Sequence, residues 1–301
     1  TPMRHSIMAD QYFSRNERTL LPILQDKQVS GIGADIYISP RDILSTTITD
    51  EWRMLRGIEA RIYAIGLQPE ATIIMAGHAA NACCWLDAAS LKWVTSSFYP
   101  EGLPAAADDM NMSGRIDILA EREWSPRMDI TMYNHPTEKE RKRGFSYLNK
   151  ECLLQSPAAN TLVIEMALAL QQSQKLGTDI TPDLLLLQLN TLSPNAESDA
   201  IESAEQEDMY MGINQDLGFL MEQLNKRIGK ENYQILVVGR PRKGHSTTTL
   251  EIANLSAQHF NVDRAAALTG TYLMAIYGHE RWVDGGHGPF IYLNRMLIEK
   301  K

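Results

Sequence analysis

The sequence predicts an α/β protein whose central sheet is mostly parallel. Residues 183–189 and 233–238 are near-continuous apolar runs, too short for helices and typical of strands buried on both faces. Between them, apolar residues recur at spacings of three and four from Ile213 to Ile228, and Gly229 follows as a helix stop. This order predicts two parallel neighbouring strands, with a helix over about residues 202–228 packed on one face of the sheet.

The length, composition and net charge of the chain indicate how many domains it forms and which kinds of partner it can bind. The chain has 301 residues, 44% of them hydrophobic and 22% charged, which is enough to bury a substantial core. We therefore expect one domain over residues 1–301, with a loop-rich insertion at 98–147. The net charge of -8 is scattered along the chain, which argues against nucleic acid or an anionic membrane surface as the main partner. No segment approaches the roughly 20 apolar residues of a membrane span.

The first half of the chain shows a helix start and several short strands. Thr46 or Thr47 can cap a helix whose first turn holds Asp50 and Glu51. Residues 61–65 and 71–75 predict two short strands, and residues 82–86 and 92–96 predict a hairpin. The four prolines and the mixed charge run of residues 98–147 indicate irregular structure that covers one edge of the sheet.

Regular structure resumes at residue 156. Residues 156–175 predict a helix that is apolar almost all round and therefore buried. Residues 263–277 predict another helix, with Asp263 as its N-cap and Gly278 as its stop. Residues 291–298 indicate a short final strand or helix. Residues 1–8 have the character of a loop, so we expect native sequence upstream.

Cysteine and histidine positions suggest no metal site. The three cysteines, two of them adjacent, give neither a disulfide framework nor the spacing of a zinc site. His78 follows a glycine at a turn, where we expect structural hydrogen bonding. His279 and His287 lie among glycines, which favours a surface loop over a metal site built with Glu280 and Asp284.

Several motifs carry a resemblance to a known family. They are Thr1-Pro-Met-Arg-His-Ser-Ile7, Ala76-Gly-His-Ala-Ala-Asn81 with Trp85, Thr95-Ser-Ser-Phe-Tyr99 and Pro157-Ala-Ala-Asn160. Through them the chain resembles the bacterial alkaline phosphatase superfamily, and within it the type I phosphodiesterase and nucleotide pyrophosphatase-like branch common in Bacteroidetes. The resemblance implies a three-layer sandwich with helices on both faces of the sheet. It also implies a periplasmic or cell-envelope location.

The resemblance implies a zinc site that this chain does not reproduce. Family members hold two zinc ions with Asp and His side chains and attack phosphate with a Thr or Ser. The family-equivalent positions after the two strands hold Ser193, Glu197, Arg240 and Pro241. Arginine stays protonated at usable pH, and proline offers no side-chain donor atom. The nucleophile and the other ligands would lie before residue 1 or after residue 301, so we expect native sequence at both ends.

Two further positions concern anion binding. A Lys-x-Arg pair that grips phosphate in some family members corresponds here to Gln68 and Glu70. Three cations follow the second predicted strand, and they are anion-binding candidates because charge-assisted contacts hold phosphate well: Arg240, Arg242 and Lys243.

The sequence therefore favours a catalytically inactive member of the superfamily, a pseudoenzyme with a binding or structural role. We expect no intact catalytic residue, no cofactor, and a protein partner or small anion as ligand. The alternative is an active metal-dependent phosphodiesterase or phosphatase with two zinc ions, completed by segments outside this chain. A third interpretation is an enzyme of another kind that reuses the crevice.

Overall fold

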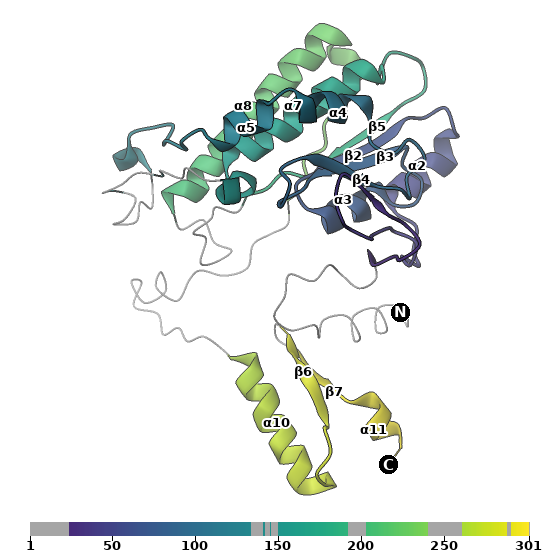
Figure 1. The fold of residues 1–301 in the computed structure, drawn as a ribbon, viewed down its shortest axis with the longest axis vertical. Helices are drawn as coiled ribbons and strands as arrows, with labels where there is room; N and C mark the ends of the chain where they lie inside the picture. Colours follow the sequence, from purple (N-terminus) through teal and green to yellow (C-terminus); the bar gives the residue numbers. More distant parts are fainter. Residues whose placement is uncertain are drawn as a thin grey trace. The chain divides into compact units, whose positions relative to one another are not determined.

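The computed structural model describes residues 24–133, 141, 145, 150–191, 203–239, 261–287 and 290–300. The described residues up to 239 belong to one compact unit, and those from 261 onward belong to a second, smaller one (Figure 1).

A five-stranded mixed sheet is the centre of the larger unit. Its order is β1-β4-β3-β2-β5, built from β1 (Gly31–Ile32), β4 (Trp93–Ser96), β3 (Ala82–Leu86), β2 (Ile62–Gly66) and β5 (Leu184–Leu187). Strand β2 pairs in parallel with both β3 and β5, whereas β3 with β4 and β4 with β1 are antiparallel. The predicted hairpin over residues 82–96 is confirmed. The predicted α/β class is confirmed as well, but the sheet, predicted to be mostly parallel, is mixed, because β4 pairs antiparallel with both β3 and β1.

Helices cover both faces of this sheet, as Figure 1 shows. Every residue of β2 and β3 is buried, so both sets of alternating side chains are covered. Tyr63 and Ile65 belong to a core cluster with Val163 and Met166 of helix α7 (Pro157–Ser173). Helix α3 (Pro69–Ala76) packs against β2 and β3 on the other side. This gives the three layers that the family resemblance implies.

Helices α2 and α3 show where local signals succeed and fail. Thr47 is the N-cap of helix α2 (Ile48–Arg56), one of the two residues predicted for that position, and its side chain forms a capping box with Asp50. The strand predicted over residues 71–75 is wrong, because these residues lie in α3. Pro69 occupies the first turn of α3, where proline is favoured, and Gly77 ends it with a φ of 57°. A short apolar run cannot by itself distinguish a buried helix from a strand.

The stretch predicted to be loop-rich contains regular structure. Helices α4 (Ala105–Met112) and α5 (Arg115–Ala120) and the short 3-10 helix η2 (Ile130–Met132) lie within residues 98–147. Helix α4 packs against α7 and β4, and α5 packs against α7 and the 3-10 helix η3 (Lys150–Gln155). The predicted buried helix after residue 156 is confirmed as α7.

The long helix after β5 is confirmed, but the strand predicted after it is wrong. Helix α8 (Ala204–Arg227) packs on α7, and its Leu220 joins a small core with Ile164 and Leu168. After the 3-10 helix η4 (Lys230–Asn232), residues 233–239 form no strand. Among the described residues, β5 pairs only with β2.

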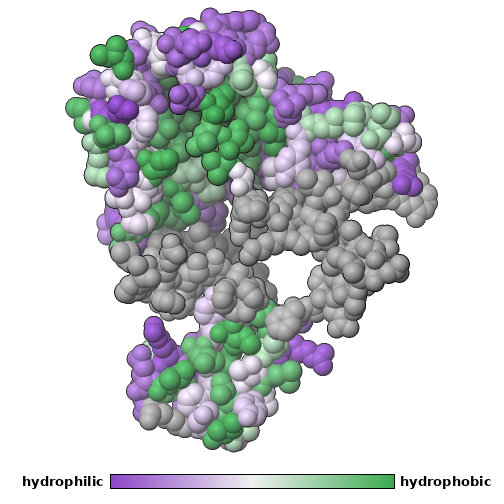
Figure 2. Space-filling view, turned by 180° about the vertical axis from the view of Figure 1, so that it is seen from behind, coloured by the Kyte–Doolittle hydropathy of each residue, from purple (hydrophilic) through white to green (hydrophobic). Residues whose placement is uncertain are grey.

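Exposure explains the missing strand. The side chains of Leu236, Val237 and Val238 are 84%, 71% and 82% exposed. Their β-type composition favours extended backbone, but strand formation also requires a partner strand and burial, which these residues lack among the described ones. Figure 2 shows that hydrophobic side chains gather on one face of the larger unit.

The smaller unit consists of helix α10 (Val262–Tyr277), the antiparallel hairpin of β6 (Val283–His287) and β7 (Phe290–Leu293), and helix α11 (Arg295–Glu299). Asn261 rather than Asp263 caps α10, and the predicted stop at Gly278 is confirmed. The surface loop predicted around His287 is wrong, because this residue ends β6. Pairing with β7 and packing against α10 stabilise the strand despite its two glycines.

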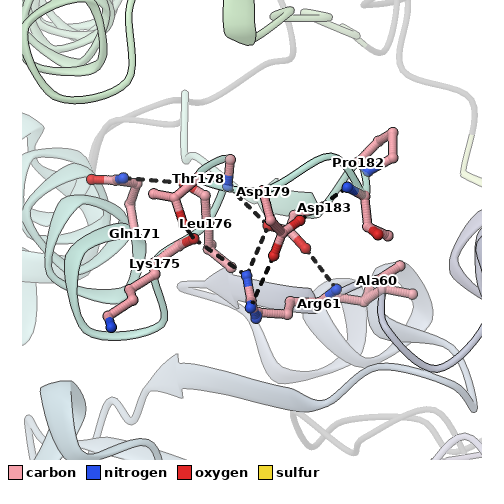
Figure 3. A network of polar contacts seen from close by, with 12 residues as sticks. Ala60, Arg61, Gln171, Lys175, Leu176, Thr178, Asp179, Pro182 and Asp183 are labelled. Atoms are coloured by element: carbon pink, nitrogen blue, oxygen red, sulfur yellow. Dashed lines mark hydrogen bonds and ion pairs between the residues drawn. The ribbon is translucent and has the colours of Figure 1, made fainter.

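A polar network joins the start of β2 to the segment before β5 (Figure 3). The Asp183 carboxylate accepts hydrogen bonds from the backbone N–H groups of Arg61 and Gly177, at 2.8 and 2.9 Å. The Arg61 guanidinium contacts Asp183 at 3.5 Å and Asp179 at 3.1 Å. These contacts fix the register in which β5 adds to β2.

Candidate functional site

The six site residues expected from the sequence lie outside the described residues: Ser193, Glu197, Arg240, Pro241, Arg242 and Lys243. The structure does describe the edge of the sheet from which the first of their loops leaves, at the C-terminal ends of β2 and β5. In open α/β sheets ligands bind at this edge. The polar groups that line it form the candidate site.

The Gln188 side chain joins the ends of the two strands. Its Oε1 accepts hydrogen bonds from the backbone N–H groups of Leu67 and Gln68, at 2.7 and 3.0 Å. Its Nε2 donates to the backbone carbonyl of Leu189 at 3.0 Å. The amide thereby satisfies two N–H groups at the point where β2 ends and the connection to α3 begins.

A second pair of amide side chains, those of Asn160 and Asn190, fixes the backbone just after β5, where the loop with the predicted site residues begins. Asn160 of α7 is fully buried; its Nδ2 donates to the Asn190 carbonyl, and its Oδ1 accepts from the Asn190 N–H, both at 2.8 Å. Asn190 in turn donates from its own Nδ2 to the Leu154 carbonyl at 2.8 Å. One residue further on, the Thr191 carbonyl accepts from the Gln206 side chain. Helices α7 and α8 thus hold the start of the loop.

Gln68 and Glu70 lie at the same edge, where the family resemblance would put a phosphate clamp. Gln68 is the N-cap residue of α3, although its side chain makes no capping bond, and Glu70 lies in the first turn. A carboxylate at this end of a helix is stabilised by the partial positive charge of the helix N-terminus. The same negative charge opposes a phosphate group, because like charges repel.

The chemistry of this edge is that of a positioning scaffold. Amide side chains bonded to backbone groups carry no charge and do not titrate near neutral pH. In the part of the chain that the structure describes, no three His, Cys, Asp or Glu side chains come together as metal ligands would. The amide side chains hold the backbone in place where two loops begin, one after β2 and one after β5. We therefore expect any ligand to be bound by side chains of these loops.

His78 makes the structural hydrogen bonds predicted for it, near the opposite edge of the sheet. The Asp50 Oδ1 accepts from the backbone N–H groups of His78 and Ala79, at 2.8 and 2.9 Å. The Asp50 Oδ2 lies 2.9 Å from both His78 Nδ1 and the backbone nitrogen of Thr47. Burial alone would raise the pKa of Asp50, but the hydrogen bonds from His78 and Thr47 together lower it below its ordinary value.

Sequence reasoning missed the amide contacts of Gln188, Asn160 and Asn190. Each amide interrupts or ends an apolar run, Asn160 near the start of α7 and Gln188 and Asn190 at the end of β5. A polar side chain in such a run is expected to be hydrogen-bonded when buried. That signal marks the residues, although it does not identify their partners.

Comparison with known proteins shows similarity to bacterial alkaline phosphatases. The sequence matches no established family profile. Alkaline phosphatase PafA of Elizabethkingia meningoseptica is 22% identical over 99% of this chain and 58% of its own length. Alkaline phosphatase PhoV of Synechococcus elongatus is 26% identical over 78% of this chain and 46% of its own length. The crystal structure of wild-type PafA matches with a TM-score of 0.76 at 22% identity, covering 92% of this chain and 57% of that chain.

The chain therefore shares its fold with alkaline phosphatase PafA. It spans about half the length of the relatives it matches. None of the described helices has the length and apolar character needed to cross a membrane. Within this fold, the edge formed by the C-terminal ends of β2 and β5 is the part of the candidate site that the structure describes. Assignment to the phosphodiesterase and nucleotide pyrophosphatase-like branch stays a prediction.

Proposed function

We propose that this chain is an alkaline phosphatase-superfamily domain that does not catalyse phosphate transfer and instead has a binding or structural role. The observation that carries the proposal is the chemistry of the edge formed by β2 and β5. Its described polar side chains are the amides of Gln188, Asn160 and Asn190, engaged with backbone groups, and Glu70 adds a negative charge where the resemblance implies a cation.

The donor set at the family-equivalent positions supports the same proposal. Among Ser193, Glu197, Arg240 and Pro241, only the Glu197 carboxylate is a good ligand for zinc. A guanidinium that stays protonated and a proline ring do not fit a dinuclear zinc site. We therefore assign no catalytic step to this chain and expect no cofactor in it.

The ligand we propose for the site is a small anion. Arg240, Arg242 and Lys243 bring three positive charges to the loop after residue 239, and charge-assisted hydrogen bonds from such groups contribute about 1.5–3 kcal/mol each. By the same family resemblance, we propose a periplasmic or cell-envelope location.

Zinc content and hydrolysis test the proposal together. We expect protein purified without added metal to hold no stoichiometric zinc, and to hydrolyse neither an aryl phosphate monoester nor a bis-aryl phosphate diester when zinc is supplied. Turnover or zinc binding that is lost in Glu197→Gln would overturn the proposal. In the matched gain-of-charge variant, Gln68→Lys with Glu70→Arg, we expect tighter binding of inorganic phosphate and still no hydrolysis.

The alternative function is an active metal-dependent phosphatase or phosphodiesterase. Two of the relatives are named as alkaline phosphatases, which favours this alternative. This chain spans only about half of their length, so it lacks a counterpart to the rest of those proteins. In that case the nucleophile and most metal ligands come from sequence beyond residues 1–301, and the same hydrolysis assay on a chain extended at both ends would show turnover.

A further inference from the structure

A cavity of about 370 Å³ lies beside α5 and the start of α7. Its walls combine apolar side chains with three guanidinium groups: Arg115, Arg122 and Arg127. Glu123 is the acidic residue among the described lining residues. A cavity of this size can enclose a small molecule.

The Arg115 guanidinium is held in place from one side. Its Nε and Nη2 donate to the Glu165 carboxylate at 3.0 and 2.6 Å, and the side chain remains 40% exposed. A guanidinium has five N–H donors in a rigid plane. The contacts with Glu165 use the Nε and Nη2 groups, so the Nη1 group, which no described residue binds, is available for the acceptor atom of a ligand. Glu165 therefore orients Arg115 without using all of its donors.

Arg127 is held in a similar way by a buried acid. Its Nη1 donates to the Asp208 carboxylate, which is fully buried, and its Nε donates to Gln215 at 3.0 Å. Asp208 is fixed in turn by the Trp124 indole N–H at 2.8 Å and the Tyr133 hydroxyl at 2.6 Å.

A glycine on helix α8, Gly212, leaves room for the Arg127 side chain. A Cβ placed on Gly212 would lie 2.9 Å from the Arg127 Nη2 and 3.0 Å from the Pro157 Cβ. The absence of a side chain at Gly212 therefore lets the guanidinium lie between α8 and the start of α7.

From these observations we infer that the cavity binds a small organic anion, a carboxylate or phosphonate-like group attached to an apolar body. Two guanidinium groups whose orientation is fixed by carboxylates are preorganised for the planar or tetrahedral oxygen groups that arginine recognises. The apolar walls, from Leu119, Leu153 and the Trp124 ring, suit a hydrophobic remainder. This site shares no residue with the proposed function and does not depend on it.

Isothermal titration of the full chain tests the inference with phenylphosphonate and benzoate as probes. Inorganic phosphate serves as the anion without an apolar body, and benzyl alcohol as the body without the anion. We expect both organic anions to bind, and to bind about tenfold more weakly to Arg122→Met and to Arg115→Lys, which is about 1.4 kcal/mol. The matched control is Arg56→Met on α2, outside the cavity lining, for which we expect unchanged affinity.

The outcomes separate this site from the proposed one. Affinity for phenylphosphonate that is unchanged by Arg240→Ala supports the cavity, whereas affinity lost in Arg240→Ala and retained in both Arg122→Met and Arg115→Lys overturns it. Absence of heat with both organic anions, or equal affinities in the wild type and the two cavity variants, also overturns it. Circular dichroism of each variant checks that the fold is retained.

Discussion

Replacement of Asp50 by alanine should destabilise the larger unit severely. The substitution removes the acceptor for the backbone N–H groups of Thr47, His78 and Ala79, and it removes the partner of the His78 ring. Loss of the capping box costs about 1 kcal/mol, and each N–H group left without an acceptor costs about 1–3 kcal/mol when buried. His78 and Ala79 are only half-buried, so the lower end of this range applies to their two N–H groups, and we expect the free energy of unfolding to fall by about 3–4 kcal/mol.

Urea unfolding followed by far-UV circular dichroism measures this loss. The matched control is Glu51→Ala, an exposed acid in the first turn of the same helix, for which we expect a change within about 0.5 kcal/mol. The reasoning fails if Asp50→Ala is no more destabilising than Glu51→Ala at the same denaturant slope.

The same pair of proteins gives a pH dependence with a defined sign. The hydrogen bonds from His78 and Thr47 place the folded-state pKa of Asp50 below its unfolded value, despite the opposing effect of burial. The stabilisation from the carboxylate is therefore fully present above the unfolded pKa of about 3.9, and it is lost as the pH falls through the folded-state pKa. The stability difference between wild type and Asp50→Ala should therefore narrow below about pH 4. A difference that widens on acidification would contradict the assignment.

Three further changes test the packing of the larger unit. Gly77→Ala should lower the free energy of unfolding, measured in urea, by at least about 2 kcal/mol more than Gly57→Ala does. Both glycines have a positive φ, but only at Gly77 would an added Cβ clash with a neighbour, the Thr47 Oγ1 at 1.9 Å. Asp208→Ala should lower the free energy of unfolding by about 3–5 kcal/mol, since it leaves the Arg127 charge without its buried partner; a loss below about 1 kcal/mol would show that the pair is not stabilising. Burial raises the pKa of the Cys84 thiol to about 12, so iodoacetamide at pH 8 should label this cysteine only after unfolding, and mass spectrometry that finds rapid labelling of the native protein would contradict the packing.

The sequence by itself determined the elements whose signals are local. Helix α2 is capped at Thr47 because the Thr47 hydroxyl and the Asp50 carboxylate accept hydrogen bonds from backbone N–H groups within the same turn. The hairpin of β3 and β4 follows from two β-rich runs a few residues apart, and the apolar surface of α7 predicts burial without reference to any partner. The motifs also identified the alkaline phosphatase fold.

Tertiary structure decided the elements whose signals are ambiguous. Residues 71–75 and 233–238 have similar apolar, β-branched composition, yet the first group lies in helix α3 and the second forms no strand. An apolar run reports only that burial is favourable, whereas the conformation depends on which surface is nearby to bury it. The Asn160–Asn190 and Asp208–Arg127 contacts likewise join residues far apart in the sequence, so no local pattern could have paired them. For this reason the amide-lined edge and the arginine-lined cavity became visible only in three dimensions.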